Sequence, residues 1–527
     1  METSQIPPSL KEAIIPPIHK GGSKADPANY RPVALTSHLI KIYEKAIRNR
    51  LTKHLDEQEI LNQNQHGFRP GRSCLTQLLA HFDNIVSLLE DGQNVDVIYL
   101  DFSKAFDKVD HNILLTKLSC IGINGKTLRW IQEFLTNRTQ RVMVNGRLSV
   151  PHEVKSGVPQ GSVLGPLLFL VLINDIDKDT LHSLIASFAD DTRATHGIKN
   201  QMDACNLQND LFQIYHWSHM NNMKFNSLKF ELLRYGKDKD LKENTSYVTP
   251  DWDVIEQKDT VKDLGVSMSA DNTFKVHIGN IAESAKKMAS WVLRTFETRE
   301  RTPMMTLYKT LVRPLLEYSS PLWTPTLKEE IKKLEDIQKS FVKKIKGVSP
   351  NYEAACQQLQ LYTLEERRAR YLAIHIWKIL EELTPNLSKD PSKCIQEQTD
   401  IPHRRGRTCR IFNLTRTPSH LQKTRKQTIR CQGPKIFNSL PKAIRNLTKI
   451  NMTTFKSKLD NHLRQKWNPS AAHTSWWQNR TTHHHLPSSS SSISAAVIEH
   501  NTAVPQPIPV PGMPLARGLT AKVLTTH

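Results

Sequence analysis

The chain has 527 residues, with 72 lysines and arginines against 51 aspartates and glutamates, which gives a formal net charge of +21. A chain of this length holds several domains, and its positive field attracts polyanions, of which nucleic acid is the obvious candidate. The seven cysteines form no Cys-x-x-Cys pair, which speaks against a zinc knuckle or a disulfide framework and favours a reducing compartment. The sequence has no apolar run of about 18 residues and no secretory signal, so we expect neither a membrane protein nor a secreted one.

The N-terminal region is predicted to be helical with interspersed loops. Apolar residues recur at helical spacing over residues 39–51 and 75–89, and Asp91-Gly92 is a helix stop signal. The β-branched run at 95–100 then predicts a buried strand that ends at Asp101.

The middle of the chain mixes helices with antiparallel hairpins. We predict helices over 113–118, 126–135, 163–174 and 207–220, and strands over 140–147, 150–154, 184–188, 192–195, 230–234 and 262–268. Asn145-Gly146 is typical of a hairpin turn. This mixture indicates an α+β fold rather than repeated βαβ units.

The C-terminal part is predicted to be helical from about residue 276. An apolar stripe over 331–345 is backed by lysines, and the helical, basic character continues to 468. Beyond 469, a serine run and a proline-rich end predict a disordered tail. The three histidines at 483–485 are read as part of that tail rather than as a metal site.

Three aspartates carry the strongest chemical signal. Asp190 and Asp191 lie at the tip of a predicted hairpin, and Asp101 ends another predicted strand. Two Mg²⁺ ions about 3.5–4 Å apart require clustered carboxylates to clamp the attacking and leaving oxygens of a phosphoryl displacement. Without metal, such carboxylates repel one another. The arrangement, with a Gly-Pro-Gly loop at 156–162 between the acids, predicts a nucleic-acid polymerase.

Seven stretches of the sequence together resemble the reverse transcriptases of non-LTR retrotransposons, close to the jockey and chicken-repeat lineages. They occur in the family's order over roughly residues 12–270 and comprise residues 17–21, 29–33, 65–69, 100–107, 156–161, 188–191 and 223–226. Several ordered matches are far more specific than any single one.

The resemblance implies an α+β, right-hand polymerase of fingers, palm and thumb, with an antiparallel palm sheet, a helical C-terminal region and a disordered tail. The implied domains are fingers (1–92), palm with interleaved fingers elements (93–235), palm and primer-grip region (236–275), thumb (276–348), basic helical domain (349–468) and tail (469–527).

The resemblance also implies a metal site. Asp101 and Asp190 would be catalytic ligands of both ions, Asp191 a weaker or second ligand, and the backbone carbonyl of Phe102 would complete one coordination shell. The ions would be two Mg²⁺, with Mn²⁺ as the alternative. The alternative for Asp191, less favoured than the ligand role, is a turn-stabilising acid.

The remaining implied residues surround the substrates. The nucleotide-binding set is Lys20, Arg31, Phe106, Gln160, Gly161 and Lys229, and the template- and primer-positioning set is Gly157, Pro159, Leu264 and Gly265. Phe106 falls at the family's steric gate, which excludes a 2′-hydroxyl. The plainer readings are solvated surface charges for the cations, a core aromatic for Phe106, and a tight turn or a glycine bulge for the two loops.

The function predicted from this resemblance is RNA-directed DNA synthesis, in which a DNA primer 3′-hydroxyl is extended on an RNA template by dNTP addition. One alternative is a truncated or domesticated copy that binds nucleic acid without polymerising. Another, an RNA virus replicase using rNTP, is disfavoured by Phe106 and the Phe-Ala-Asp-Asp turn. The chain begins near the fingers, so we expect endonuclease activity to come from elsewhere. We expect a nuclear or cytoplasmic ribonucleoprotein, and the basic run at 403–410 is a candidate import signal.

Overall fold

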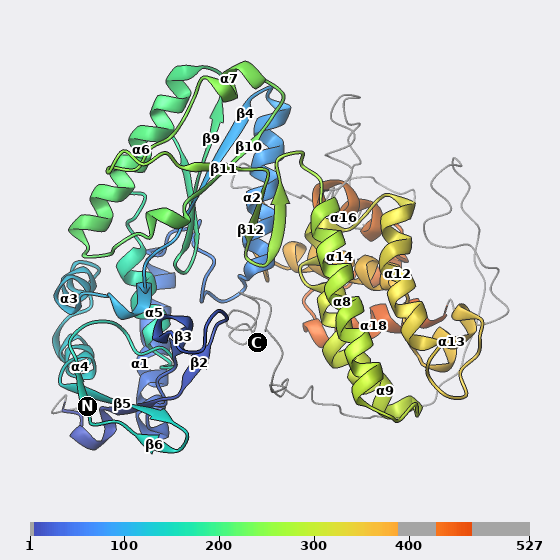
Figure 1. Cartoon of the computed structure of the whole chain (residues 1–527), viewed down its shortest axis with the longest axis horizontal. Helices are drawn as coiled ribbons and strands as arrows, with labels where there is room; N and C mark the ends of the chain where they lie inside the picture. Colours follow the sequence, from blue (N-terminus) through green and yellow to red (C-terminus); the bar gives the residue numbers. More distant parts are fainter. Residues whose placement is uncertain (1–4, 388–427, 466–527) are drawn as a thin grey trace.

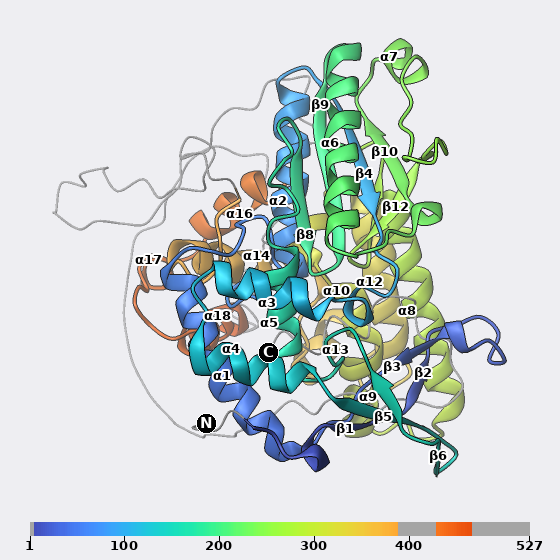
Figure 2. The same ribbon diagram turned by 90° about the vertical axis from the view of Figure 1, so that its left-hand side faces the viewer.

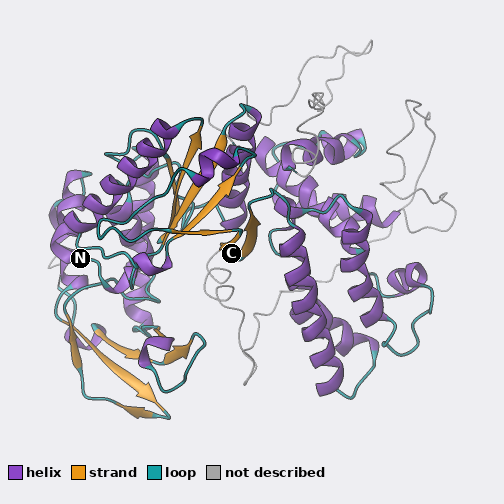
Figure 3. Cartoon of the chain, turned by 45° about the horizontal axis from the view of Figure 1, so that its top comes forward, coloured by secondary structure: helices purple, strands orange, loops and turns teal. Residues whose placement is uncertain are grey.

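The computed structural model of the chain describes residues 5–387 and 428–465. One half of these residues mixes sheets with helices, and the other half is helical (Figures 1 and 3). The predicted α+β class with a mainly antiparallel central sheet and a helical C-terminal region is therefore confirmed. The predicted tail (469–527), the basic run at 403–410 and the histidines at 483–485 lie outside the described residues. Within the described ranges, no helix is both long enough and apolar enough to cross a membrane.

A five-stranded sheet with the order β11-β10-β4-β9-β8 forms the centre of the mixed half. Its strands are β4 (Asn94–Leu100), β8 (Leu184–Phe188), β9 (Asp191–Ile198), β10 (Glu231–Tyr235) and β11 (Glu256–Lys258). Neighbouring strands are antiparallel except for β10 and β11.

Both faces of this sheet are buried. Val95 and Val97 pack in one hydrophobic cluster with α2 (Cys74–Glu90), whereas Ile98 and Leu100 pack in a second cluster with α5 (Gly165–Ile173) and α6 (Gln201–Met220). Figure 1 shows α6 and α2 on opposite sides of the strands, and Figure 2, turned by 90°, shows α6 in front of them. Because side chains alternate between covered faces, β4 is apolar almost throughout, which explains why the sequence reveals it so clearly.

Smaller sheets and helices surround the end of the sheet that carries the acids. The strands are β1 (Glu12–Ile15), β2 (Pro17–His19), β3 (Tyr30–Pro32), β5 (Arg138–Val144), β6 (Arg147–Leu148) and β7 (His152–Val154). The helices are α1 (His38–Glu57), α3 (His111–Cys120) and α4 (Gly125–Leu135). Asn145 and Gly146 join β5 to β6 with φ values of 50° and 77°, as the Asn-Gly signal predicts for a type I′ turn.

Helix α1 is predicted correctly as a helix, yet it buries an acid. The Glu44 side chain accepts the N–H groups of Val163 and Leu164, at 2.7 and 3.0 Å, immediately before α5. Burial raises the pKa of Glu44, and these hydrogen bonds oppose that shift. A carboxylate at a helix N-terminus satisfies N–H groups that have no partner within the helix. The apolar residues Ile42 and Tyr43 are exposed instead.

The helical half shares one hydrophobic cluster with α2 and one face of the central sheet. Its helices are α8 (Lys275–Thr295), α9 (Arg301–Leu307), α10 (Arg313–Glu317), α11 (Ser320–Trp323), α12 (Lys328–Val342), α13 (Tyr352–Gln358), α14 (Leu364–Leu380), α16 (Ile429–Asn438), α17 (Lys442–Arg445) and α18 (Met452–Gln465). Arg430 on α16 pairs with Asp83 on α2, with 2.8 Å between Nε and Oδ1. The helices after residue 349 thus pack onto the same core as those before it.

A second hairpin, β12 (Thr260–Asp263) and β13 (Val266–Ser269), lies before the helical half. The sequence predicts strand structure over 262–268, and the structure divides it at Leu264 and Gly265. Both residues have positive φ values, 43° and 87°, which reverse the chain direction. A short helix, α7 (Lys239–Glu243), follows β10 in the mixed half.

Candidate active site

The three acidic residues lie at one end of two paired central strands. In the β8–β9 hairpin, Phe188 pairs with Asp191, which leaves Ala189 and Asp190 as a two-residue turn. The β4–β9 register pairs Leu100 with Thr192, so Asp101 follows directly beside Asp191. The sheet register therefore brings together three acids that the sequence places on different segments.

Asp101 is held by the segment that follows α6. Its backbone carbonyl accepts the N–H of Asn226 at 2.8 Å, and its carboxylate Oδ2 lies 2.9 Å from Lys229 Nζ. The Asp101 side chain is 33% exposed and that of Lys229 is 65% exposed, so this ion pair is open to solvent and can exchange partners.

The backbone of Phe102 is directed away from that same segment. Phe102 forms an antiparallel bridge with Phe225, and the flanking hydrogen bonds join Asp101 to Asn226 and Ser103 to Lys224. In such a pair, the N–H and C=O of the central residue point to the opposite side. The Phe102 carbonyl thus faces away from the Phe225 segment and is not used in this bridge.

The carboxylates of the three acids are suitable ligands for divalent ions, although their side chains are not arranged as a complete metal site. Among the residues that the structure describes, no group of three or more His, Cys, Asp or Glu side chains is arranged to hold a metal ion. Carboxylate and carbonyl oxygens are nevertheless the ligands that Mg²⁺ prefers. The donor set at Asp101, Phe102, Asp190 and Asp191 fits such ions by its chemistry.

Two of the cations predicted to bind the nucleotide, Arg31 and Lys229, lie near the third, Lys20, and Lys229 also pairs with Asp101. Lys20 follows β2 and Arg31 lies on the paired strand β3, whose register places Ile18 opposite Arg31. Burial lowers the pKa of Lys20, and the nearby charges of Arg31, Lys229 and Lys104 lower it further. Several cations that lie close together suit a polyanion such as a triphosphate.

The loop at 156–162 packs closely against the segment after Asp101. A Cβ on Gly157 would lie 2.8 Å from the Phe106 carbonyl oxygen, and a Cβ on Gly161 would lie 2.8 Å from that of Ala34. With φ values of 89° and 113°, both positions favour glycine. Gln160 Nε2 donates to Asp107 Oδ1 at 2.9 Å. Pro159 directly precedes Gln160 in the same loop.

Phe106 sits between two other aromatic rings. Its ring stacks on Phe169 of α5, with 4.5 Å between centroids and an interplanar angle of 15°. Phe68 meets it edge-on at 6.1 Å. Phe106 is only half-buried, so one part of the ring is fixed by packing and another part remains accessible.

The turn at Leu264 and Gly265 is fixed from two sides. The Tyr318 hydroxyl donates to the Leu264 carbonyl at 2.8 Å. Next to the turn, the buried side chain of Asp263 pairs with that of Arg193 on β9. The turn is therefore connected to the strand that begins with Asp191.

The sequence reasoning missed a role for Gln65, which it recorded only within a matching stretch. The structure places the segment 64–67 beside β8 and joins the Gln65 amide to Ala189 of the acid turn. The clue in the sequence is the neighbouring Gly67, since a glycine after a polar residue marks a close backbone approach.

The residues of this site lie within the part of the chain that is similar to known proteins. Residues 18–268 match the family model described as "Reverse transcriptase (RNA-dependent DNA polymerase)". The chain is 28% identical over 352 residues to the probable RNA-directed DNA polymerase from transposon X-element of Drosophila melanogaster, covering 65% of this chain and 38% of that protein. It is also 28% identical over 359 residues to the RNA-directed DNA polymerase from mobile element jockey of the same species, covering 66% and 39%.

Among solved structures, a telomerase from Candida albicans in complex with a fragment of telomeric RNA aligns with a TM-score of 0.39 and 12% identity. That alignment covers 69% of this chain and 67% of the telomerase chain.

Proposed function

We propose that this chain, which carries a reverse transcriptase domain related to those of non-LTR retrotransposons, is an RNA-directed DNA polymerase that extends a DNA 3′-hydroxyl on an RNA template. The observation that carries the proposal is the meeting of Asp101 with Asp190 and Asp191 at the ends of paired strands, next to a cluster of cations. The chain spans 38% and 39% of the two insect proteins described above. The polymerase activity is therefore proposed for the matching domain, and the other activities of those longer proteins are not carried over.

In this proposal the acid cluster holds two Mg²⁺ ions, or Mn²⁺. Asp101 and Asp190 would ligate both ions, with Asp191 and the Phe102 carbonyl as further donors. When bound, the ions stabilise charge on the attacking and leaving oxygens of the displacement. Asp101 must first exchange Lys229 for an ion, which its solvent-open ion pair allows.

The cation cluster would bind the triphosphate of the incoming dNTP. Arg31 offers a planar fork for phosphate oxygens, and Lys20 a point charge. Lys229, once free of Asp101, would lie near the leaving pyrophosphate and could donate a proton to it. Catalysis would then depend on positioning and charge stabilisation, as phosphoryl transfer generally does.

The neighbouring loops would position the nascent base pair. We assign Gly157, Pro159, Gln160 and Gly161 to the surface below it, supported by the close packing of this loop on the Phe106 segment. Leu264 and Gly265 would contact the primer. From the family resemblance we also propose fingers (1–92), palm with interleaved fingers elements (93–235), palm and primer-grip region (236–275) and thumb (276–348). The described helices after 349, proposed as a basic helical domain, pack in the same hydrophobic cluster as the proposed thumb helices.

Primer extension by the full-length protein tests the proposal. On poly(rA)/oligo(dT) with Mg²⁺, we expect dTMP to be incorporated. Tight binding without extension by folded protein would instead support the binding-only alternative. A preference for UTP over dTTP would support an rNTP-using replicase.

Substitution of Phe106 tests the steric gate. In Phe106→Val, the smaller side chain leaves room for a 2′-hydroxyl, so we expect discrimination against rNTP to fall at least about tenfold. The ratio of kcat/KM for dTTP and UTP measures this change. Phe106→Tyr keeps the ring and should keep the discrimination. An unchanged ratio in Phe106→Val would assign the ring to packing against Phe169 alone.

Binding of the primer–template should depend strongly on salt, because phosphate contacts release counterions. With six or more such contacts, we expect the affinity to fall about 10³-fold or more between roughly 50 and 200 mM salt. Fluorescence anisotropy with a labelled primer–template measures the slope. If the affinity did not change with salt, the basic side chains behind the net charge of +21 would not be contacting the phosphates of the primer–template.

Such a polymerase needs a DNA 3′-hydroxyl as its primer. We propose that an endonuclease activity outside the residues described nicks the target DNA to supply it. We also propose that the protein acts within a nuclear or cytoplasmic ribonucleoprotein, because its template is RNA and its charge favours assembly with it.

A further inference from the structure

The segment at residues 64–67 forms a short extra strand contact at the edge of the central sheet. Ser187 N–H donates to the Asn64 carbonyl at 3.1 Å, and His66 N–H donates to the Ser187 carbonyl at 3.0 Å. Gln65 thereby forms a parallel bridge with Ser187 on β8, just before the acid turn.

The side chain of Gln65 holds both polar backbone groups of Ala189. Gln65 Oε1 accepts the Ala189 N–H at 2.8 Å, and Gln65 Nε2 donates to the Ala189 carbonyl at 3.3 Å. The same Oε1 accepts the Gly67 N–H at 2.8 Å. Gln65 is only 4% exposed, so these bonds are shielded from competing water. A side-chain amide is suited to this role, because its oxygen accepts and its nitrogen donates at the same side-chain tip.

Ala189 needs such support because of its backbone conformation. Its φ of 55° lies in the left-handed region, which residues with a Cβ rarely adopt. Asp190 follows immediately, so any relaxation of Ala189 would change the direction in which the Asp190 side chain leaves the turn. Gly67 closes the other side of the turn, where a Cβ would lie 2.4 Å from the Ala189 nitrogen.

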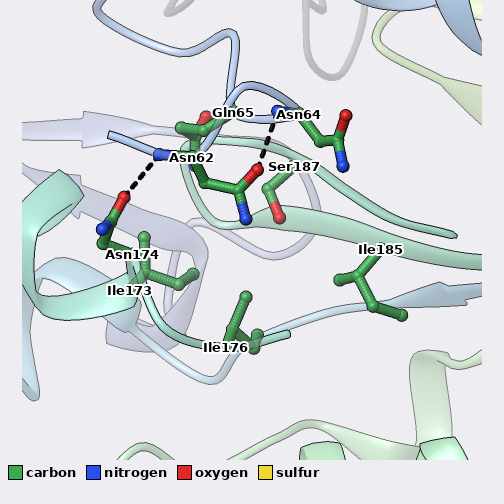
Figure 4. Close-up of a pocket in the computed structure, with 8 residues that line it drawn as sticks. All are labelled: Asn62, Asn64, Gln65, Ile173, Asn174, Ile176, Ile185 and Ser187. Atoms are coloured by element: carbon green, nitrogen blue, oxygen red, sulfur yellow. Dashed lines mark hydrogen bonds between the residues drawn. The ribbon is translucent and has the colours of Figure 1, made fainter. Parts of the chain in front are cut away.

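The Gln65 segment is itself anchored to the end of α5. Asn62 donates its N–H to Asn174 Oδ1 at 2.7 Å, and Asn62 Oδ1 accepts the Asn64 N–H at 2.8 Å (Figure 4). Asn174 Nδ2 donates to the Ile60 carbonyl at 2.8 Å, and Arg69 donates to the Asn62 carbonyl at 2.7 Å. Gln65 is thus the tip of a fixed framework rather than of a free loop.

We infer that Gln65 is a positioning residue of the active site, whose amide locks the strained Ala189 turn so that Asp190 and Asp191 face Asp101. This inference deepens the proposed function and rests on it for the meaning of the acids. Groups that orient metal ligands typically change metal affinity or activity by 10–100-fold when they are removed.

The test compares Gln65→Met and Gln65→Glu with the wild-type full-length chain. Gln65→Met keeps the length of the side chain and loses all three hydrogen bonds. Gln65→Glu is close in shape. Measured at alkaline pH, where the introduced carboxyl is ionised, it keeps the acceptor and loses the donor to the Ala189 carbonyl. Gln338→Met is the matched control, because Gln338 is another fully buried glutamine, bonded to Tyr308 and Tyr352 in the helical half.

Three readouts separate positioning from general stability. In Gln65→Met, we expect hydrogen exchange of the amides at 186–192 to accelerate, Mn²⁺ affinity measured by electron paramagnetic resonance to fall about tenfold or more, and kcat to fall by about 10–100-fold with KM for dTTP nearly unchanged. Gln65→Glu should show a smaller change in the same exchange. Gln338→Met should leave all three unchanged, whatever its effect on melting.

The outcomes are separable from those of the proposed function. A folded Gln65→Met variant with wild-type exchange and wild-type Mn²⁺ affinity would overturn the inference. If that variant does not fold, wild-type exchange at 186–192 in Gln65→Glu would overturn it. Amide hydrogen exchange and Mn²⁺ binding can be measured without polymerisation. A wild-type chain that fails to extend primers would therefore contradict the proposed function, and these two measurements would still decide the role of Gln65.

Discussion

Replacing Asp190 by asparagine should lower the rate of dNTP incorporation by at least about 10³-fold. The substitution keeps the size of the side chain and removes the charge of a carboxylate proposed to ligate both ions. Metal ions contribute several kcal/mol of charge stabilisation in the transition state, and each ~1.4 kcal/mol corresponds to a factor of ten in rate. Single-nucleotide incorporation on an RNA template at saturating Mg²⁺ measures the loss.

A matched control for this variant is Asp179→Asn, which removes the same charge from an exposed residue in the loop between α5 and β8. Its incorporation rate should stay within about twofold of the wild type, as surface substitutions usually have small effects. If Asp190→Asn retained wild-type incorporation while Asp179→Asn did too, the acid turn would not be the catalytic centre.

Replacing Arg193 by methionine should destabilise the fold by about 3–5 kcal/mol, because it leaves a buried carboxylate without its partner. The Arg193 and Asp263 side chains are only 1% and 4% exposed. Burial raises the pKa of Asp263, and the Arg193 charge counteracts that shift. Urea unfolding followed by circular dichroism measures the loss.

The double variant Arg193→Met with Asp263→Leu distinguishes the ion pair from its surroundings. Since it removes both charges together, it should recover much of the stability lost in the single variant. Its primer extension should nevertheless remain impaired if this pair holds the turn at Leu264 and Gly265 in register with β9. A single variant as stable as the wild type would show that Asp263 is not dependent on Arg193.

The sequence predicts those parts of the site that local signals specify. A buried strand ending in Asp101, a hairpin carrying Asp190 and the Asn145-Gly146 turn each follow from a few adjacent residues, and the structure contains all three. Their relative placement, however, depends on the strand order β10-β4-β9-β8. No local pattern predicts that order, and the family resemblance implied only an antiparallel palm sheet with the acids at a shared metal site.

Contacts between residues far apart in the sequence cannot be predicted from local sequence patterns. Gln65 and Ala189 are separated by 124 positions, and the bond from Tyr318 to Leu264 spans 54. Nothing in the sequence marks Glu44 as the residue that caps the start of α5. Apolar periodicity would place Ile42 and Tyr43 on the buried face of α1, whereas the structure buries Glu44 and exposes those two residues. In each case a buried polar group finds a partner that only the tertiary structure supplies.

The central claim is that Asp101 and Asp190 jointly hold divalent ions at the primer terminus. The most direct measurement is the anomalous difference map of a crystal of the full-length chain with Mn²⁺, primer–template and a non-hydrolysable dNTP analogue. The account predicts Mn²⁺ peaks between the carboxylates of Asp101 and Asp190, with Lys229 displaced towards the triphosphate. Mn²⁺ bound elsewhere, with Asp101 still paired to Lys229 in the ternary complex, would contradict it.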